Sequence, residues 1–423
     1  MFSIERRNAK RRKVERERQA NNAPHLVEYY HEAGDPYSHL MVQVLPEFCR
    51  RFDVELKIIL VAPPPDWAAP EREKLESYAR TDAARLAERA GLKFNDAGRQ
   101  PSREQVEVAN TMLSAALGAE AFFEQAEQIG AKLWANEDIE TSAHESANHD
   151  AVLQDGAEQR DAKGHYLGAT LLYGGEWYWG LDRLHYLEER LTELGAATGG
   201  NPSPIFVPPS ILTGSAPASS GDRPEIHWYL SFRSPYTGIV ADRIKALADA
   251  YGADLKLRFV LPMVMRGMEI RRSKGFYIMS DVVREAERLG IPFGDICDPV
   301  GKPVERGYAI LHRAIELGKG YEFAKSFLSG VWSEGIDAGS DAGLKRITER
   351  AGLSWAEMKP LLGTEDWREV EERNQAEMLS YDVWGVPSFR VGDTAAWGQD
   401  RLWVTEDALK AAASSNDTST GAV

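Results

Sequence analysis

IHWYLSFRSPYTGIV, residues 226–240, decides how the second half of this chain is interpreted. Its first five residues are mostly apolar or aromatic, as in a short buried strand. Ser234 and Pro235 follow, directly before a helical pattern from Tyr236 to Tyr251. Serine is favoured at the N-cap of a helix, and proline at the first helical position. The stretch therefore predicts a strand, a tight turn and a helix that begins beside the Ser234 hydroxyl.

Ser234 has two interpretations at this junction. It is either an ordinary helix cap or a hydroxyl held in place to act on a ligand. A hydroxyl beside the unpaired N–H groups of a helix N-terminus is well placed to stabilise an anion. The tetrapeptide SPYT (234–237) leaves both roles open.

The flanking sequence predicts a small mixed sheet. A second strand, DLKLRFVL (254–261), follows the helix, and a β-α-β unit of this kind implies a parallel pair with a right-handed crossover. Several amphipathic helical stretches come next. PSFRVG (387–392), a turn and a last helix then close the domain. This order predicts a thioredoxin-like sheet with a helical insertion.

The first half repeats this pattern at an offset of 199 residues. LKIILV (56–61) aligns with LKLRFV (255–260), and DPYS (35–38) aligns with SPYT. DAARLAERAGLKF (82–94) aligns with DVVREAERLGIPF (281–293). The offset then changes, and YGGEWYWGLDRL (173–184) matches VGDTAAWGQDRL (391–402). Matches in a constant order predict a tandem duplication of one domain.

The expected organisation has two tandem α/β domains, each a small mixed thioredoxin-like sheet with a helical insertion. A Gly/Pro/Ser-rich stretch separates them and has the composition of a linker. The predicted segments are a basic N-terminal extension (1–24), a first domain (25–194), the linker (195–224), a second domain (225–412) and a flexible tail (413–423).

Composition restricts the class of protein. A chain of 423 residues is long enough for two cores, and its net charge of −15 argues against nucleic-acid binding by the body of the chain. The first 22 residues are basic, with eight Lys or Arg against three Glu, and are expected to be solvated and partly disordered. No apolar run is long enough to cross a bilayer, and the N-terminus lacks the apolar core of a secretory signal. A cytoplasmic location and no membrane partner are therefore expected.

The two cysteines, Cys49 and Cys297, are far apart and form no C-x-x-C motif. The sequence therefore predicts neither a disulfide framework nor a dithiol redox site. His144 and His149 are five residues apart, which does not place both on one helix face. No metal site is predicted.

Four motifs of the second half, in order, resemble those of a known superfamily. They are SPYT (234–237), SKGFY (273–277), WGVPSF (384–389) and WGQDRL (397–402). Together they resemble the DsbA-like thioredoxin superfamily, and within it the 2-hydroxychromene-2-carboxylate isomerases and kappa-class glutathione transferases. The resemblance covers most of residues 225–412 and implies glutathione as the cofactor.

By this resemblance Ser234 would stabilise the glutathione thiolate as the catalytic residue. Pro387 would be cis, and the backbone of Val386 would pair with the cysteinyl part of glutathione. The alternatives are an ordinary cap at Ser234 and a trans proline in an edge strand.

The resemblance also implies that Gln399 and Asp400 receive the γ-glutamyl end of glutathione. Lys274 would hold its glycine carboxylate. Alternatively, Asp400 caps the final helix and Lys274 is simply solvated. Arg401 is expected to be a structural ion-pair partner.

The first half departs from the family pattern. Asp35 stands where the second half has Ser234, and its carboxylate would repel a thiolate. Ala169 replaces the cis-proline, so that bond is expected to be trans. We interpret this half as a degenerate copy that packs against the second half as an internal pseudo-dimer.

The resemblance implies a glutathione-dependent isomerase or transferase acting on a small, aromatic-derived molecule. The alternative is a homologue of the thiol–disulfide oxidoreductases that lacks redox cysteines and acts as a non-catalytic binding protein. The stretch before Lys274, MVMRGMEIRRS (263–273), lacks the family's Asn-x-Pro-Pro element and is basic instead. This departure suggests a different, more anionic ligand.

Overall fold

The structure, a computed structural model, describes residues 4–139, 149–211 and 223–419. They form two compact units. The N-terminal unit comprises Ile4–Pro208 together with Arg271–Tyr277. The C-terminal unit comprises Pro209–Ile270 and the chain from Ile278 onward.

The observed boundary differs from the predicted linker of residues 195–224. Its first part belongs to the N-terminal unit because backbone groups tie it down. The N–H of Thr198 donates to the carbonyl of Arg51 at 2.9 Å, and the N–H of Ile205 donates to the carboxylate of Glu188 at 3.1 Å. Phe206 is buried. Residues 212–222 lie outside the described residues.

The N-terminal unit has a four-stranded sheet in the order β2-β1-β3-β4. β1 runs parallel to β2 and antiparallel to β3, as the β-α-β pattern and the closing hairpin predict. β1 is buried along most of its length, which is typical of a central strand with both faces covered. The strands are β1 (Leu26–His31), β2 (Glu55–Leu60), β3 (Thr170–Tyr173) and β4 (Glu176–Trp179). The helices after the first are α2 (Pro36–Arg51), α3 (Arg72–Ala90), α4 (Arg103–Ala116), α5 (Phe122–Ala135), α6 (His149–Ala162) and α7 (Leu181–Glu193).

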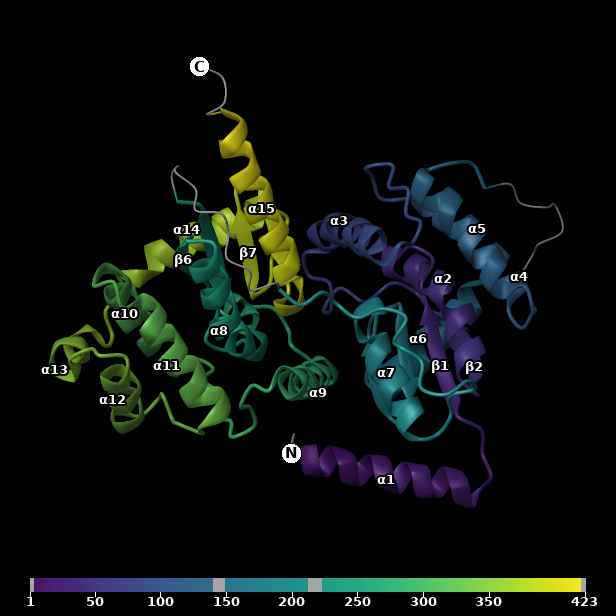
Figure 1. Cartoon of the computed structure of the whole chain (residues 1–423), viewed down its shortest axis with the longest axis horizontal. Helices are drawn as coiled ribbons and strands as arrows, with labels where there is room; N and C mark the ends of the chain where they lie inside the picture. The colour runs from purple at the N-terminus through teal and green to yellow at the C-terminus, as the bar shows by residue number, and fades with distance from the viewer. Residues whose placement is uncertain (1–3, 140–148, 212–222, 420–423) are drawn as a thin grey trace. The chain divides into compact units, whose positions relative to one another are not determined.

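The C-terminal unit repeats this topology, with its sheet in the order β6-β5-β7-β8. Helices α10 to α13 are drawn in green in Figure 1, and α11 packs on α8. Their shared core includes the stacked rings of Phe232 and Phe327. The strands are β5 (Glu225–Leu230), β6 (Asp254–Phe259), β7 (Ser388–Val391) and β8 (Thr394–Trp397). The helices are α8 (Pro235–Ala250), α9 (Arg272–Leu289), α10 (Lys302–Glu316), α11 (Gly320–Ser333), α12 (Asp341–Arg350), α13 (Trp355–Met358), α14 (Trp367–Ser380) and α15 (Leu402–Ser419), with short 3-10 helices η1 (Met263–Arg266), η2 (Lys359–Leu361) and η3 (Gln399–Arg401).

One side-chain hydrogen bond occurs at the same place in both units. In the N-terminal unit the hydroxyl of Tyr37 donates to Asp82 at 2.8 Å. In the C-terminal unit Tyr236 donates to Asp281 at 2.8 Å. In each unit the tyrosine lies in the first turn of the helix that follows the first strand (α2 or α8), and the aspartate lies in the next long helix (α3 or α9). The shared contact agrees with the offset of 199 residues found in the sequence.

The expectation of a partly disordered N-terminal extension is wrong, because α1 (Ile4–Ala20) is a helix. Its basic side chains reach the β3–β4 hairpin. Arg11 forms a bidentate ion pair with Glu176, with hydrogen bonds of 2.8 and 2.6 Å. Lys10 donates to the carbonyl of Gly175 at 3.2 Å. Among the described helices, none is long and apolar enough to span a membrane.

Candidate functional site

Ser234 is the N-cap of α8. Its backbone is extended, with φ −90° and ψ 114°, and its hydroxyl accepts the N–H of Thr237 at 3.2 Å. Pro235 occupies the first helical position, where its missing N–H leaves no helical hydrogen bond unmade. The predicted strand, turn and helix are confirmed, and Ser234 serves as a cap.

The Ser234 hydroxyl makes a second contact that a cap does not require. It donates to the carbonyl oxygen of Val386 at 3.1 Å. The bond between Val386 and Pro387 is cis, as the resemblance implies. Three predicted site residues therefore come together where α8 begins, although Val386 and Pro387 follow Ser234 by more than 150 positions.

Gln399 lies in a buried polar network of the C-terminal unit. Its side chain is 1% exposed. Arg243, on α8, donates to its side-chain oxygen at 2.6 Å and to its carbonyl at 3.2 Å. Its amide nitrogen donates to Glu285 of α9 at 2.6 Å. The sequence analysis missed Arg243 and Glu285, because nothing in their local sequence indicates a shared partner.

Asp400 follows Gln399 in η3, where its carboxylate lies 3.5 Å from the guanidinium of Arg401. Arg401 is 5% exposed, which supports its predicted role as an ion-pair partner. Asp400 lies inside η3, whose N-cap is Gly398 with no side-chain cap hydrogen bond. The alternative prediction that Asp400 caps the final helix is therefore wrong.

Lys274 falls in the Arg271–Tyr277 segment that belongs to the N-terminal unit. Its ammonium donates to the carbonyl of Ala68 at 3.4 Å and lies 5.8 Å from the ring centre of Tyr166. Burial lowers the pKa of Lys274 to about 8. The predicted glycine-carboxylate ligand is thus a buried lysine grouped with the first half of the chain.

The equivalent junction in the N-terminal unit has a different chemistry. Asp35 caps α2, accepting the N–H of Tyr37 at 3.2 Å and that of Ser38 at 3.1 Å. The bond before Ala169 is trans, as expected, and Ala169 has φ +52°. Its N–H donates to the hydroxyl of Ser38 at 3.0 Å. Ser38, in the first turn of α2, therefore links this helix to the segment before β3, as Ser234 links α8 to the segment before β7 in the other unit.

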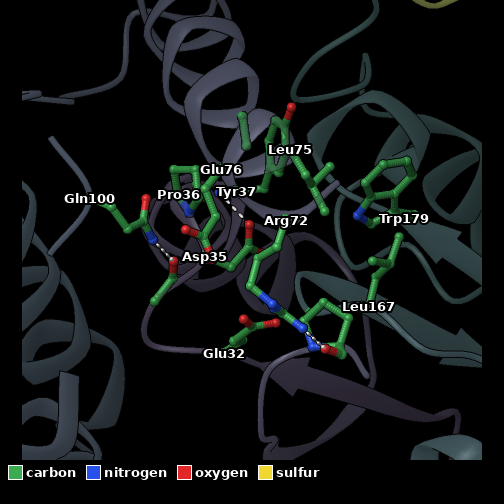
Figure 2. Close-up of a pocket in the computed structure, with 14 residues that line it drawn as sticks. Glu32, Asp35, Pro36, Tyr37, Arg72, Leu75, Glu76, Gln100, Leu167 and Trp179 are labelled. Atoms are coloured by element: carbon green, nitrogen blue, oxygen red, sulfur yellow. Dashed lines mark hydrogen bonds between the residues drawn. The ribbon is translucent and has the colours of Figure 1, made fainter. Parts of the chain in front are cut away.

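A pocket of about 70 Å³ opens at this N-terminal junction (Figure 2). Glu32 and Asp35 line it together. Burial and the charge of Asp35 raise the pKa of Glu32 to about 8, and burial raises that of Asp35 to about 6. The sequence analysis missed Glu32, because a glutamate at the end of a strand gives no local sign that it is buried.

The two thiols do not have the environment of reactive cysteines. Burial raises the pKa of Cys49 to about 11. The pKa of Cys297 is also raised, by burial and by the nearby carboxylates of Asp337 and Asp298. A raised pKa lowers the thiolate fraction at neutral pH, which disfavours thiol chemistry at either position. Within the described residues, no group of His, Cys, Asp and Glu is arranged to hold a metal ion.

Comparison with known proteins finds a family match in the C-terminal half of the chain. A family model described as a DsbA-like thioredoxin domain matches residues 225–410. Two curated relatives, from Pseudomonas putida and Pseudomonas sp. strain C18, are both named 2-hydroxychromene-2-carboxylate isomerase. Each is 22% identical over 192 residues, which is 44% of this chain and 93% or 89% of the relative.

Solved structures of similar proteins carry related names. A structure of 2-hydroxychromene-2-carboxylate isomerase is 20% identical with a TM-score of 0.41, covering 46% of this chain and 98% of its own. The cytosolic disulfide reductase DsbM from Pseudomonas aeruginosa, solved with GSH, is 16% identical with a TM-score of 0.36 and covers 45% and 98%. With the family match and the observed topology, residues 225–410 of this chain form a DsbA-like thioredoxin domain.

Proposed function

We propose that the chain is a glutathione-dependent isomerase or transferase in which Ser234 stabilises the glutathione thiolate. The observation that carries this proposal is the position of the Ser234 hydroxyl. It lies at the N-terminus of α8 and within hydrogen-bond distance of the residue before cis Pro387. Hydroxyl, helix N-terminus and exposed backbone are the three groups that a bound thiolate peptide needs.

The hydroxyl of Ser234 has one proton to donate. In the structure it goes to the carbonyl of Val386 at 3.1 Å. When the thiolate binds, the Ser234 hydroxyl donates its hydrogen bond to the sulfur instead of to Val386. The carbonyl of Val386 can then accept a hydrogen bond from the cysteinyl N–H of glutathione. The exchange keeps both groups hydrogen-bonded and adds the attraction of the helix dipole for the negative sulfur.

The chemistry that follows needs no redox step. The thiolate adds to a conjugated, aromatic-derived substrate, and the electron pair moves to the substrate carbonyl oxygen. The former double bond rotates as a single bond. The electron pair then returns and expels the same thiolate, so glutathione is regenerated. The protein supplies the activated nucleophile and its orientation.

One further assignment belongs to the proposal. Gln399 and Asp400 receive the γ-glutamyl end of glutathione. Gln399 must then exchange its hydrogen bonds with Arg243 and Glu285 for bonds to the ligand.

The network around Gln399 also favours a second candidate, a non-catalytic binding protein. The side chain is 1% exposed and is already bonded at both its oxygen and its nitrogen. A domain that never opens this network would not bind glutathione in the proposed way. A thiol–disulfide oxidoreductase would in addition need a nucleophilic sulfur at position 234, which holds serine.

Calorimetry with glutathione separates these candidates. The native chain is compared with Ser234→Ala and with the matched control Ser340→Ala. Ser340 caps α12, accepting the N–H of Gly343 at 3.0 Å, so the control removes an equivalent cap far along the sequence. The proposal requires weaker binding in Ser234→Ala and unchanged binding in Ser340→Ala. Equal binding by all three proteins, or no binding by the native chain, contradicts it. Reduction of insulin disulfides by the native chain would support the oxidoreductase instead.

A further inference from the structure

The pocket of the N-terminal unit is bounded by carboxylates and apolar side chains. It lies where α2 begins, at the position equivalent to the Ser234 junction of the other unit. Small-molecule sites are commonly apolar hollows with a few fixed polar groups. The carboxylates are Glu32, Asp35 and Glu76, and the apolar lining includes Pro36, Leu75, Ala79, Leu167 and Trp179.

Glu32 is buried in this pocket without a partner. It is 8% exposed, and Figure 2 shows its carboxylate on the wall of the pocket, below Asp35 and Arg72. Its backbone N–H donates to the hydroxyl of Ser38 at 3.2 Å. No group in residues 4–139, 149–211 or 223–419 hydrogen-bonds or ion-pairs with its carboxylate. A carboxylate buried without a donor is unfavourable, so its retention calls for an explanation.

Asp35 does not raise the same question, because α2 uses its carboxylate fully. It accepts the N–H groups of Tyr37 and Ser38 and, at 2.9 Å, the hydroxyl of Ser38. Capping thus explains Asp35 in structural terms. Glu32 caps no helix.

Gly168 leaves the space that the two carboxylates occupy. A Cβ atom at Gly168 would lie 2.9 Å from Oε2 of Glu32 and 3.2 Å from Oδ2 of Asp35. Both oxygens therefore approach the same point of the backbone. They place two acidic groups side by side at one end of the pocket.

The nearby arginines do not neutralise Glu32 by contact. Arg72 lines the pocket, but its Nη2 donates to the carbonyl of Pro64 at 2.7 Å and to Asp66 at 3.1 Å. Arg160 donates to the carbonyl of Ala62 at 3.2 Å. Both lower the pKa of Glu32 through space, yet burial and Asp35 outweigh them and raise it to about 8. Within the described residues, neither arginine therefore forms an ion pair with the carboxyl group of Glu32.

We propose that this pocket binds a small molecule with a primary ammonium group and a short apolar chain. Glu32 releases its proton to solvent as the cation enters, and the ammonium N–H groups then donate to the resulting carboxylate. Asp35 and Glu76 add attraction, and the apolar chain packs against Leu167 and Trp179. A thiolate or a carboxylate ligand would be repelled by the same groups. The N-terminal unit is then a second binding domain with the opposite charge preference, and this site does not depend on the proposed glutathione chemistry.

The proposal is tested by titrating the full chain with n-propylammonium chloride and with 1-propanol. Binding of each probe is measured by saturation-transfer NMR of the probe. The two probes have the same chain length and differ in charge. The proposal predicts saturable binding of n-propylammonium in the millimolar range and at most weak binding of 1-propanol. Equal binding of both probes, or no saturable binding of n-propylammonium, overturns it. This comparison uses the native chain and needs no variant.

Two matched variants then locate the site. Glu32→Gln removes the ionisable carboxyl group with little change of shape and should weaken n-propylammonium binding about tenfold or more. Glu73→Gln makes the same change at an exposed position of α3 and should leave binding unchanged. Unchanged binding in Glu32→Gln, or equal losses in both, places the ligand elsewhere and overturns the proposal. Ser234→Ala should bind n-propylammonium like the native chain, which separates this result from the glutathione test.

Discussion

The hydroxyl of Ser234 joins the first turn of α8 to the carbonyl of Val386 across 3.1 Å. The same oxygen accepts the N–H of Thr237, so one side chain caps a helix and contacts the residue before cis Pro387. A cap alone needs only the first of these contacts. The second connects the helix N-terminus to the segment that, in the proposed function, holds a thiol peptide.

Replacement of Ser234 by alanine should affect stability and binding separately. Loss of the cap should lower the free energy of unfolding by about 1 kcal/mol, measured by urea denaturation. Ser340→Ala should produce a loss of similar size. If Ser234→Ala is as stable as the native chain, the hydrogen bond from the N–H of Thr237 to the Ser234 hydroxyl does not stabilise α8, contrary to the prediction.

Gln399→Ala tests recognition of the γ-glutamyl group. The native chain should bind glutathione more tightly than cysteinylglycine, which lacks that group, and Gln399→Ala should remove the difference. Loss of one hydrogen-bonding side chain corresponds to roughly tenfold in affinity. Because Gln399 is bonded to Arg243 and Glu285, the variant's stability is measured alongside. A preference for glutathione that survives in a folded Gln399→Ala protein would exclude Gln399 from the γ-glutamyl site.

The buried Glu32 gives the stability of the protein a definite pH dependence. Its pKa is raised to about 8, from an ordinary value of 4.5. Between these values the folded protein keeps a proton that the unfolded chain releases, so the free energy of unfolding falls as pH rises. Glu32→Gln should flatten this slope in urea denaturation between pH 5 and pH 8.

His31, next to Glu32 in the chain, acts in the opposite sense. Burial lowers its pKa to about 3, so protonation of the unfolded chain destabilises the fold as pH falls below the ordinary histidine pKa of 6.5. The difference between native and Glu32→Gln proteins removes this shared contribution. Parallel pH profiles for the two proteins would mean that Glu32 is ionised in the fold, contrary to its burial.

The repeated tyrosine–aspartate hydrogen bond should stabilise both units. Asp82 and Asp281 are 2% and 1% exposed, so loss of a donor leaves a buried carboxylate with one bond fewer. Tyr37→Phe and Tyr236→Phe should each lower the free energy of unfolding by about 1 to 3 kcal/mol. Arg284 also pairs with Asp281, at 2.6 Å, so this carboxylate keeps a charged partner when the tyrosine hydroxyl is removed. No measurable effect in either variant would contradict the value assigned to these bonds.

Local sequence was sufficient to predict the strands and helices around Ser234 and the N-cap of α8. The Ser-Pro pair after an apolar run predicted where α8 begins, and the alternation of strand and helix predicted the parallel pairing of β5 with β6. The cis bond at Pro387 followed from the resemblance and not from the residues, since base rates favour trans.

Local sequence could not predict contacts that depend on tertiary packing. Gln399 meets Arg243 and Glu285, each more than a hundred positions away. Lys274 lies in a short segment that groups with the other half of the chain. Glu32 packs closely against Gly168, which is distant in sequence, and a side chain at position 168 would occupy the same space.

The most direct test of the central claim is the thiol pKa of bound glutathione, measured by ultraviolet absorption of the thiolate as pH is varied. The account predicts that the pKa falls below that of free glutathione in the native complex and returns toward the free value in Ser234→Ala. A bound thiol that titrates identically in both proteins would show that Ser234 caps α8 and does not act on the sulfur.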